Sequence, residues 1–382
     1  MIPRKNKYDV IIVGGGLAGL TSAILLAHQK INVLLIEKKT YPFHKVCGEY
    51  VSNEVLYFLR SIGFNPFEYG ASSITKLRIS TPAGKNISSL LDMGGFGLSR
   101  YTMDYALAEQ AKKNGVEILT ETKVVDIIFK EDCFEVKLNS VEMLSAKLVI
   151  ASYGKRDALD KKMNRDFIGS HTGYLGVKYH IKTNYPIDEV GLDNFAGGYC
   201  GIVKIEDDKY NLCYLYHRNS RTSFNAIAEL EEKVLFKNPV IRNLFSESDF
   251  IFKEPEVINE ISFSPKQLIE NHIFMCGDSA GLITPLCGNG MAIAIHSAKL
   301  LSDLICKIKM SEKMNMKVRM GLEENYQKVW DENFRRRLKW GRRIQTIFGR
   351  PLMTGIGVRS IHFIPPLERW LISKTHGKPL KD

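Results

Sequence analysis

The sequence is poor in cysteine and has no pattern that would pair the cysteines it does have. Seven cysteines are scattered over 382 residues, and no two of them form a Cys-x-x-Cys motif. An odd number of scattered cysteines excludes the disulfide frameworks of small secreted domains. No Cys/His cluster of the kind that holds zinc is present either. We therefore predict that the protein binds no metal and resides in the reducing cytoplasm.

Long hydrophobic runs are also missing. No stretch reaches the roughly 18 uninterrupted apolar residues that a membrane-spanning helix needs. Basic residues near the N-terminus precede a short apolar run, as they do in a signal peptide. That run passes into a glycine cluster without a small-residue cleavage site, so we predict a buried strand there and no spanning segment.

Acidic residues are scarce in the C-terminal part of the chain. From Arg335 onward there are twelve Lys or Arg and two Asp or Glu, so this segment carries nearly all of the net charge of +11. Apolar side chains interleave with the basic ones. Two interpretations stay open: a helical cap with a solvated basic face, and peripheral contact with a membrane. No nucleic-acid-binding motif accompanies the charge, so we predict no nucleic-acid partner.

The segment YDVIIVGGGLAGLTSAILLAHQKINVLLIE, residues 8–37, is typical of a strand, a tight turn, a helix and a second strand. In its G-x-G-x-x-G pattern, Gly14 permits the turn, Gly16 lets the backbone approach a pyrophosphate, and Gly19 lets helix and strand pack closely. The helix N-terminus offers N–H groups and a positive dipole end to phosphates. Glu37 ends the second strand, where an acid binds a ribose diol. The pattern therefore indicates FAD or NAD rather than NADP.

A second strand, turn and helix pattern occurs far along the chain, in NHIFMCGDSAGLITPLCGNGMAIAIHSA from residue 271. Asp278 follows a short apolar strand, and Gly288 and Gly290 precede an apolar helix that starts at Met291. An Asp at the end of a strand accepts hydrogen bonds from sugar-alcohol hydroxyls, and the N–H groups of a glycine turn bind a ring or a phosphate. On its own, this pattern is more often an ordinary capped helix.

Together, the two glycine patterns resemble those of FAD-dependent oxidoreductases that include geranylgeranyl reductases and p-hydroxybenzoate-hydroxylase-like monooxygenases. The segment GLSRYTMDYALAEQ is similar to their R-x-x-x-D-x-x-L helix. One departure is Tyr153, which stands in place of a motif Asp and bears on NADPH recognition more than on FAD. The resemblance implies FAD as cofactor and NADPH or NADH as electron donor. The FAD-binding residues that it implies are Gly14, Gly16, Gly19, Glu37, Lys38, Lys45, Arg100, Val124, Gly154, Asp278, Pro285, Gly288, Asn289, Gly290 and Met291.

The resemblance also implies an α/β fold. A discontinuous, Rossmann-like FAD-binding domain would carry an inserted α+β lobe, an antiparallel-sheet substrate domain. In this lobe GVKYHIK, GYCGIVKI and YNLCYLYH alternate or run apolar between turns. The predicted segments are 1–75, 97–155 and 266–308 for the FAD-binding domain, 76–96 and 156–265 for the substrate domain, and 309–382 for a basic, helical C-terminal segment.

The segment HKVCGEYVS, residues 44–52, follows the second predicted strand. It resembles the K-x-C-G-E segment of the reductase branch, which lies beside the flavin, and this implies that the Cys47 thiol is close to the flavin ring. Three roles stay open: a proton donor to a substrate carbon, a group that tunes the flavin potential, and packing as a small hydrophobe. Cys47 is our candidate catalytic residue.

The predicted substrate lobe departs from the geranylgeranyl reductases at their Y-x-W-x-F-P motif. Tyr199 is kept, but Gly201 and Val203 stand in place of the Trp and the Phe; these three are our candidate substrate residues. The departure favours NAD(P)H-dependent monooxygenation of a small hydrophobic aromatic or polyketide-like compound through a C4a-hydroperoxyflavin. Two alternatives stay open: FAD-dependent reduction of isoprenoid double bonds, and a flavin-bearing binding protein without turnover. The W-x-W-x-I-P signature of flavin halogenases is absent.

Overall fold

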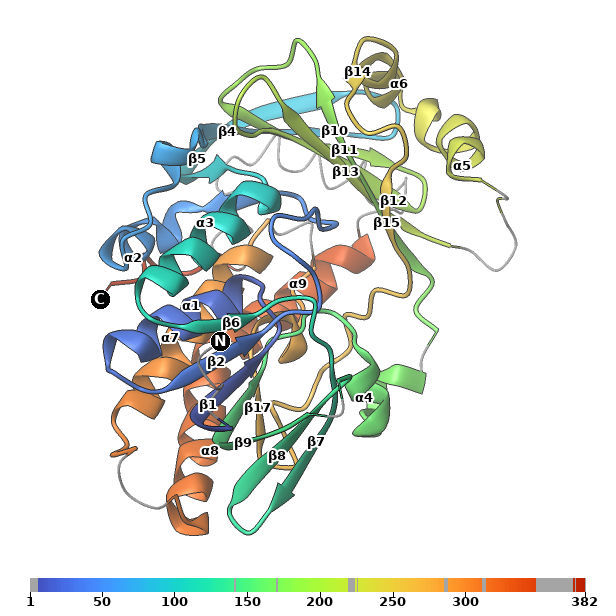
Figure 1. Ribbon diagram of the computed structural model, residues 1–382. Coiled ribbons are helices and arrows are strands. Elements are labelled where there is room, and N and C mark those ends of the chain that lie inside the picture. Colours follow the sequence, from blue (N-terminus) through green and yellow to red (C-terminus); the bar gives the residue numbers. More distant parts are fainter. Residues whose placement is uncertain are drawn as a thin grey trace.

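Two β-sheets organise the molecule, one in each lobe (Figure 1). The computed structural model describes residues 6–381 except 141, 170, 219–223, 225, 285–287, 311–313, 348–373 and 375. Of the predicted site residues, Pro285 therefore lies outside the described residues. Much of the predicted C-terminal segment lies outside them too.

The first sheet is built around buried parallel strands. In order across the sheet, its strands are β16 (Ile269–Glu270), β17 (Ile273–Met275), β9 (Met143–Ala151), β1 (Lys7–Val13), β2 (Val33–Ile36) and β6 (Glu117–Leu119). β1 lies between β9 and β2 and is parallel to both. Its residues 10–13 and all of β2 are buried, as expected of strands covered on both faces. A hairpin of β7 (Val124–Lys130) and β8 (Cys133–Leu138) extends from β9.

Helices from distant parts of the chain pack together beside this sheet. α1 (Leu17–His28) contacts β1 and β2 and packs against α3 (Arg100–Lys113) and α7 (Gly290–Cys306). α8 (Met316–Trp330) packs on α7 and continues through a π-helical turn, η7 (Asp331–Arg335). The first sheet with these helices is the predicted Rossmann-like core, and the α/β class is confirmed.

The second sheet is almost entirely antiparallel. In order, its strands are β14 (Asp249–Phe250), β10 (Tyr174–Lys182), β13 (Tyr210–His217), β12 (Gly198–Lys204), β11 (Glu189–Phe195), β4 (Ser72–Ser80), β5 (Asn86–Gly97) and β3 (Tyr50–Ser52), with β15 (Glu256–Ile258) also paired to β10. β11 and β4 form its parallel pair. The predicted antiparallel lobe is thus present. β3 pairs with β5 in this sheet although residues 50–52 fall within the predicted FAD-binding segment, and the exact domain boundaries stay a prediction.

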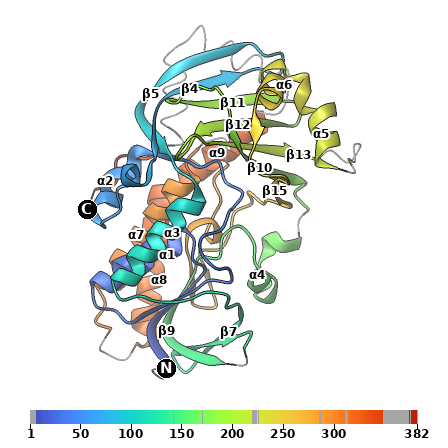
Figure 2. The same ribbon diagram turned by 45° about the horizontal axis from the view of Figure 1, so that its top comes forward.

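The two faces of the second sheet have different surroundings. Helices α5 (Ile227–Lys233) and α6 (Pro239–Ser246) cover its outer face, where alternate residues such as Val177, Tyr179 and Tyr214 are buried. The opposite face looks toward the first lobe (Figure 2). α9 (Arg336–Ile347) lies beneath this inner face, and its Ile344 packs with Tyr199 and Leu215.

Short helices connect these elements. They are η1 (Asn53–Val55), α2 (Leu56–Ser61), η2 (Pro66–Tyr69), α4 (Ala158–Lys162), η3 (Asp166–Gly169), η4 (Leu235–Lys237) and η5 (Gly277–Ser279). Within the part of the chain that the structure describes, no helix combines the length and hydropathy needed to cross a membrane.

Candidate active site

A continuous cavity of about 570 Å³ runs between the two lobes. One end is formed by the glycine turn before α1 and by charged side chains that include Glu37 and Arg100. The other end lies against the inner face of the second sheet and is apolar. The apolar lining residues there include Leu77, Ile79, Val190, Leu192, Leu215, Ile258, Ile261 and Leu282. The cavity therefore joins a polar end, suited to phosphates and sugars, to a hydrophobic end.

The glycine turn leaves no room for side chains where backbones meet. Gly14 has a φ of +105°, and a Cβ built on it would lie 2.6 Å from the carbonyl oxygen of Ser152. A Cβ on Gly19 would lie 2.1 Å from the carbonyl oxygen of Gly14. Gly16 is the N-cap of α1 and provides no side-chain cap, so the N–H groups of the first helical turn are available to an anion.

Glu37 braces the same turn. Its Oε2 accepts a hydrogen bond from the backbone N–H of Gly15 at 2.8 Å, and its Oε1 accepts one from the backbone N–H of Lys39 at 3.0 Å. The hydroxyl of Tyr41 donates to the carbonyl oxygen of Gly15 at 2.6 Å. Lys38, which also lines the cavity, pairs with Asp157 at 2.9 Å.

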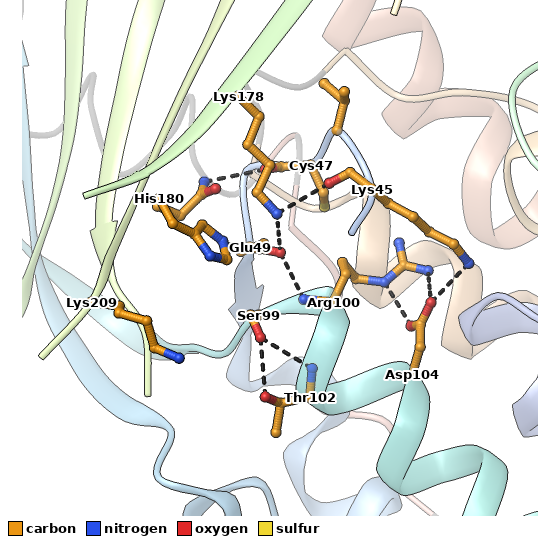
Figure 3. A network of polar contacts seen from close by, with 12 residues as sticks. Lys45, Cys47, Glu49, Ser99, Arg100, Thr102, Asp104, Lys178, His180 and Lys209 are labelled. Carbon is orange, nitrogen blue, oxygen red and sulfur yellow. Dashed lines mark hydrogen bonds and ion pairs between the residues drawn. The ribbon is translucent and has the colours of Figure 1, made fainter. Parts of the chain in front are cut away.

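Two cations face the turn. A Cβ built on Gly16 would lie 3.5 Å from Nη2 of Arg100 and 3.6 Å from Nζ of Lys45. Both cations share Asp104: the guanidinium binds its two oxygens at 2.7 and 2.8 Å, and the ammonium binds Oδ2 at 2.8 Å (Figure 3). Burial alone would raise the pKa of Asp104, but Arg100 and Lys45 outweigh it and lower that pKa. Burial lowers the pKa of Lys45 although Asp104 opposes this, whereas the pKa of Arg100 is raised, so Arg100 is the side chain that stays charged beside a diphosphate.

The second glycine pattern closes the cavity from the other side. Asp278, in η5, and Gly288, Gly290 and Met291, at the start of α7, all line it. Asn289 does not line the cavity, because its side chain turns toward Glu54 and donates to Oε2 at 3.0 Å.

Comparisons with known proteins agree with this geometry. The family model described as FAD binding domain matches residues 7–190. The chain is 25% identical over 346 residues to the digeranylgeranylglycerophospholipid reductase of Methanosarcina acetivorans, covering 86% of this chain and 81% of that protein. It is 24% identical over 365 residues to digeranylgeranylglycerophospholipid reductase 2 of Methanothermobacter thermautotrophicus, covering 92% and 89%.

Solved structures share the fold. A geranylgeranyl bacteriochlorophyll reductase-like protein from Thermoplasma acidophilum superposes with a TM-score of 0.73 at 22% identity, covering 88% of this chain and 86% of that one. Two structures of halogenase PltM with FAD give TM-scores of 0.70 and 0.69, at 18% and 17% identity, covering 84% and 83% of this chain and 73% of that one. Over residues 7–190 this chain matches an FAD-binding domain. The predictions of an FAD-dependent oxidoreductase and of FAD as the cofactor are confirmed.

The side chains fit FAD. The uncapped N-terminus of α1 and the Lys45–Arg100 pair suit its diphosphate. Among the other FAD-binding residues that the sequence predicts, Gly154 lines the cavity, whereas Val124, a buried residue of β7, does not. The role of each of these residues stays a prediction.

Cys47 lines the cavity on the loop between β2 and β3, where the two lobes meet. A second thiol, Cys213, also lines it. Burial, followed by the neighbouring Cys47 thiol, raises the pKa of Cys213 to about 12, so Cys213 stays protonated.

The predicted substrate residues are divided between cavity and core. Tyr199 and Gly201 line the cavity. Val203 does not line it and instead packs with Ile74 and Ile205. Strand register places Gly201 in a row across the inner face of the sheet. The row runs through Lys178, Cys213, Gly201, Leu192 and Ile79.

Sequence reasoning missed the polar side chains that surround the Cys47 loop. Lys178 and His180 lie at alternate positions of β10, and both contact Glu49 (Figure 3). A signal was present in the sequence, because a lysine and a histidine interrupt an otherwise apolar strand at positions that share one face. Their partner Glu49 lies about 130 residues away in the chain and no local pattern points to it.

Proposed function

We propose that this chain is an FAD-dependent reductase that saturates carbon–carbon double bonds of an isoprenoid-type substrate. The observation that carries the proposal is the cavity itself, which joins the FAD end to an apolar floor on the second sheet. Two of the relatives, which this chain matches over most of their length, are named digeranylgeranylglycerophospholipid reductases. An apolar chain would bury its surface against Leu77, Ile79 and Leu192.

Reduction of a double bond requires a hydride and a proton. Reduced FAD supplies the hydride when it is bound. The proton must reach the neighbouring carbon from a group inside the cavity. Cys47 lines the cavity where its polar and apolar parts meet, and it is the group we propose for this task. The apolar walls would hold the chain and exclude water.

Monooxygenation, which the departure at Gly201 and Val203 led us to expect, is not confirmed by the comparisons. The named relatives favour the reductase alternative instead. The likeness to a halogenase concerns the fold alone, at 17% to 18% identity.

NADPH or NADH stays our predicted electron donor. Tyr153 occupies the motif position of an Asp, and its hydroxyl donates to Asp160 at 2.6 Å. Anaerobic addition of each nucleotide should bleach the flavin absorbance if it is the donor. Failure of both would direct the search to a protein donor.

Peripheral membrane contact, one of the two interpretations that the sequence left open, also becomes more specific. Arg336, Lys339 and Arg343 are exposed on α9 and share one face of the helix. Ile344 of the same helix lines the cavity. We propose that this basic face meets an anionic membrane from which an isoprenoid lipid enters.

The deciding experiment is to reduce the FAD-loaded protein without oxygen and mix it with geranylgeraniol. We expect the oxidised flavin absorbance to return, and mass spectrometry to detect a product heavier by two hydrogens for each bond reduced. Reoxidation only by oxygen, with an oxygenated product from an aromatic compound, would overturn the proposal in favour of monooxygenation.

A further inference from the structure

The loop that carries Cys47 is held by hydrogen bonds to three successive backbone carbonyls. Lys178 Nζ donates to the carbonyl oxygen of Lys45 at 3.2 Å, and Lys155 Nζ donates to that of Val46 at 3.1 Å. Asn211 Nδ2 donates to the carbonyl oxygen of Cys47 itself at 3.2 Å. The donors come from β10, from the loop after β9 and from β13. The loop is therefore held in place by hydrogen bonds from segments that are distant in sequence.

A buried carboxylate anchors the same loop. Glu49 is fully buried and has a φ of +53°, a left-handed conformation that a non-glycine residue adopts only under constraint. Its Oε1 accepts hydrogen bonds from Lys178 Nζ at 2.5 Å and from the backbone N–H of Arg100 at 2.7 Å. Its Oε2 lies 2.8 Å from Nε2 of His180.

The charge on Glu49 is maintained by its partners. Burial alone would raise the pKa of this carboxyl, but the Lys178 ammonium and the His180 hydrogen bond lower it to about 2. Lys178 is also fully buried. Buried ion pairs of this kind contribute little net stability, because desolvation offsets the attraction, and their best-attested use is to select one geometry.

The contacts of Lys178 indicate that the ion pair favours one conformation of the loop that carries Cys47. Its ammonium lies between the Glu49 carboxylate and the loop carbonyl (Figure 3). In strand register Lys178 is paired with Cys213, which is paired with Gly201 of the cavity floor. Through the N–H of Arg100, Glu49 is tied to the first turn of α3, which supplies the cation at the glycine turn. The network therefore joins the diphosphate end, the thiol and the floor.

We propose that Glu49, Lys178 and His180 are positioning residues that hold the Cys47 thiol in one place between the FAD end of the cavity and the floor of the second sheet. Without them, the loop would lose the hydrogen bond from Lys178 to the carbonyl oxygen of Lys45 and the buried anchor at Glu49, and only the Lys155 and Asn211 contacts would remain. The proposal concerns the placement of the thiol and does not depend on which substrate is reduced.

The test is the alkylation rate of Cys47 by N-ethylmaleimide in the FAD-loaded protein, followed by peptide mass spectrometry. The rate is taken on its high-pH plateau, where it reports access to the thiol rather than its ionisation. In Glu49→Gln and Lys178→Met we expect the plateau rate to rise roughly tenfold or more, the factor that one charge-assisted hydrogen bond is worth.

The double variant Glu49→Gln/Lys178→Met separates positioning from simple destabilisation. Either single substitution removes one member of the buried Glu49–Lys178 ion pair and leaves the other charge buried, whereas the double substitution removes both charges. We expect the melting temperature of the double variant to exceed that of either single variant, while Cys47 stays rapidly alkylated. A folded double variant with wild-type alkylation would overturn the proposal.

Asp193→Asn is the matched control. It removes a carboxylate from another buried ion pair of the second sheet, in which Asp193 binds Arg78 through two contacts of 2.9 Å. Neither residue lines the cavity. Alkylation of Cys47 should be unchanged in this variant, and an increase equal to that of Glu49→Gln would mean that any weakening of the sheet releases the loop. Because the alkylation experiment uses no substrate, its result does not depend on whether the protein reduces isoprenoid double bonds.

Discussion

Single residues set the charge at the FAD end of the cavity. Arg100 and Lys45 both face Gly16, and Asp104 binds both of them. The pKa of Arg100 is raised, because Asp104 outweighs the effect of burial. The guanidinium therefore stays charged, and its orientation is fixed by the carboxylate before FAD arrives.

Arg100→Met should weaken FAD binding. A charge-assisted hydrogen bond contributes about 1.5–3 kcal/mol, so we expect the dissociation constant of FAD to rise roughly 10- to 100-fold. Titration of the apoprotein by flavin fluorescence measures this. Lys112→Met is the control, because Lys112 is an exposed residue of the same helix and pairs with nearby Glu109. Equal affinity in wild type and Arg100→Met would contradict the assignment.

Cys47→Ala should lower turnover while leaving FAD bound. If the thiol donates the proton, the loss in kcat is roughly 100- to 10,000-fold, the range for general acid catalysis. Cys213→Ala is the matched control: this thiol lines the same cavity, but its high pKa makes it a poor acid. Single-turnover oxidation of the reduced flavin by substrate measures both variants. Normal turnover in Cys47→Ala would reduce this thiol to a packing residue.

At the scale of elements, local sequence patterns predicted the strands and helices far better than they predicted which strands pair with each other. The strand, turn and helix of residues 8–28 follow from the run of apolar residues and the glycines. The parallel pairing of β11 with β4 and the placement of β3 do not, because strand pairing depends on contacts between distant segments. The Glu49–Lys178 pair was missed for the same reason.

Gly201 in β12 leaves space at the cavity floor, because it has no side chain. A Cβ at this position would lie no closer than 3.6 Å to any neighbour, so the backbone accepts a side chain, which would enter the cavity. We expect Gly201→Leu to weaken binding of geranylgeraniol roughly 10- to 100-fold, as overpacking does, and to spare the shorter geraniol.

Gly321→Leu is the control for this prediction, because Gly321 lies in α8 and, apart from its chain neighbours and the nearby backbone of α8, no atom of the described residues comes within 4 Å of its added Cβ. KM values for the two alcohols provide the measurement. Equal losses for both alcohols in Gly201→Leu would show that the substitution damages the sheet instead of shortening the cavity.

At the scale of the whole molecule, the half-buried His296 links stability to pH. His296 of α7 packs its ring edge-on against Phe334 of η7, with centroids 5.1 Å apart. Burial lowers its pKa from 6.5 to about 4, with smaller effects from Glu54, Arg337, Lys299 and Asp303.

The folded protein therefore holds His296 neutral between pH 6.5 and 4, whereas the unfolded chain binds a proton there. Stability from this group is complete above pH 6.5 and is lost as the pH falls toward 4. His296→Gln should remove about 2 kcal/mol of the loss in unfolding free energy between pH 7 and pH 5. Urea unfolding at pH 7 and at pH 5 measures this loss. If the unfolding free energy falls by the same amount in the wild type and in His296→Gln, His296 is not the group that links stability to pH.

The basic face of α9 provides the test of membrane contact. Arg336, Lys339 and Arg343 are exposed on a helix whose Leu338 is buried and whose Ile344 reaches the cavity. Each basic residue near an anionic surface contributes about 1 kcal/mol. Changing all three to Gln should therefore weaken binding to phosphatidylserine vesicles roughly 100-fold. Sedimentation with vesicles measures the affinity, and added salt should also weaken vesicle binding by the wild-type protein.

The control is to change Lys30, Lys112 and Lys113 to Gln. This removes the same charge from exposed positions elsewhere and should have little effect on vesicle binding. Equal losses in both triple variants would mean that net charge, and not the face beside the cavity, brings the protein to the membrane.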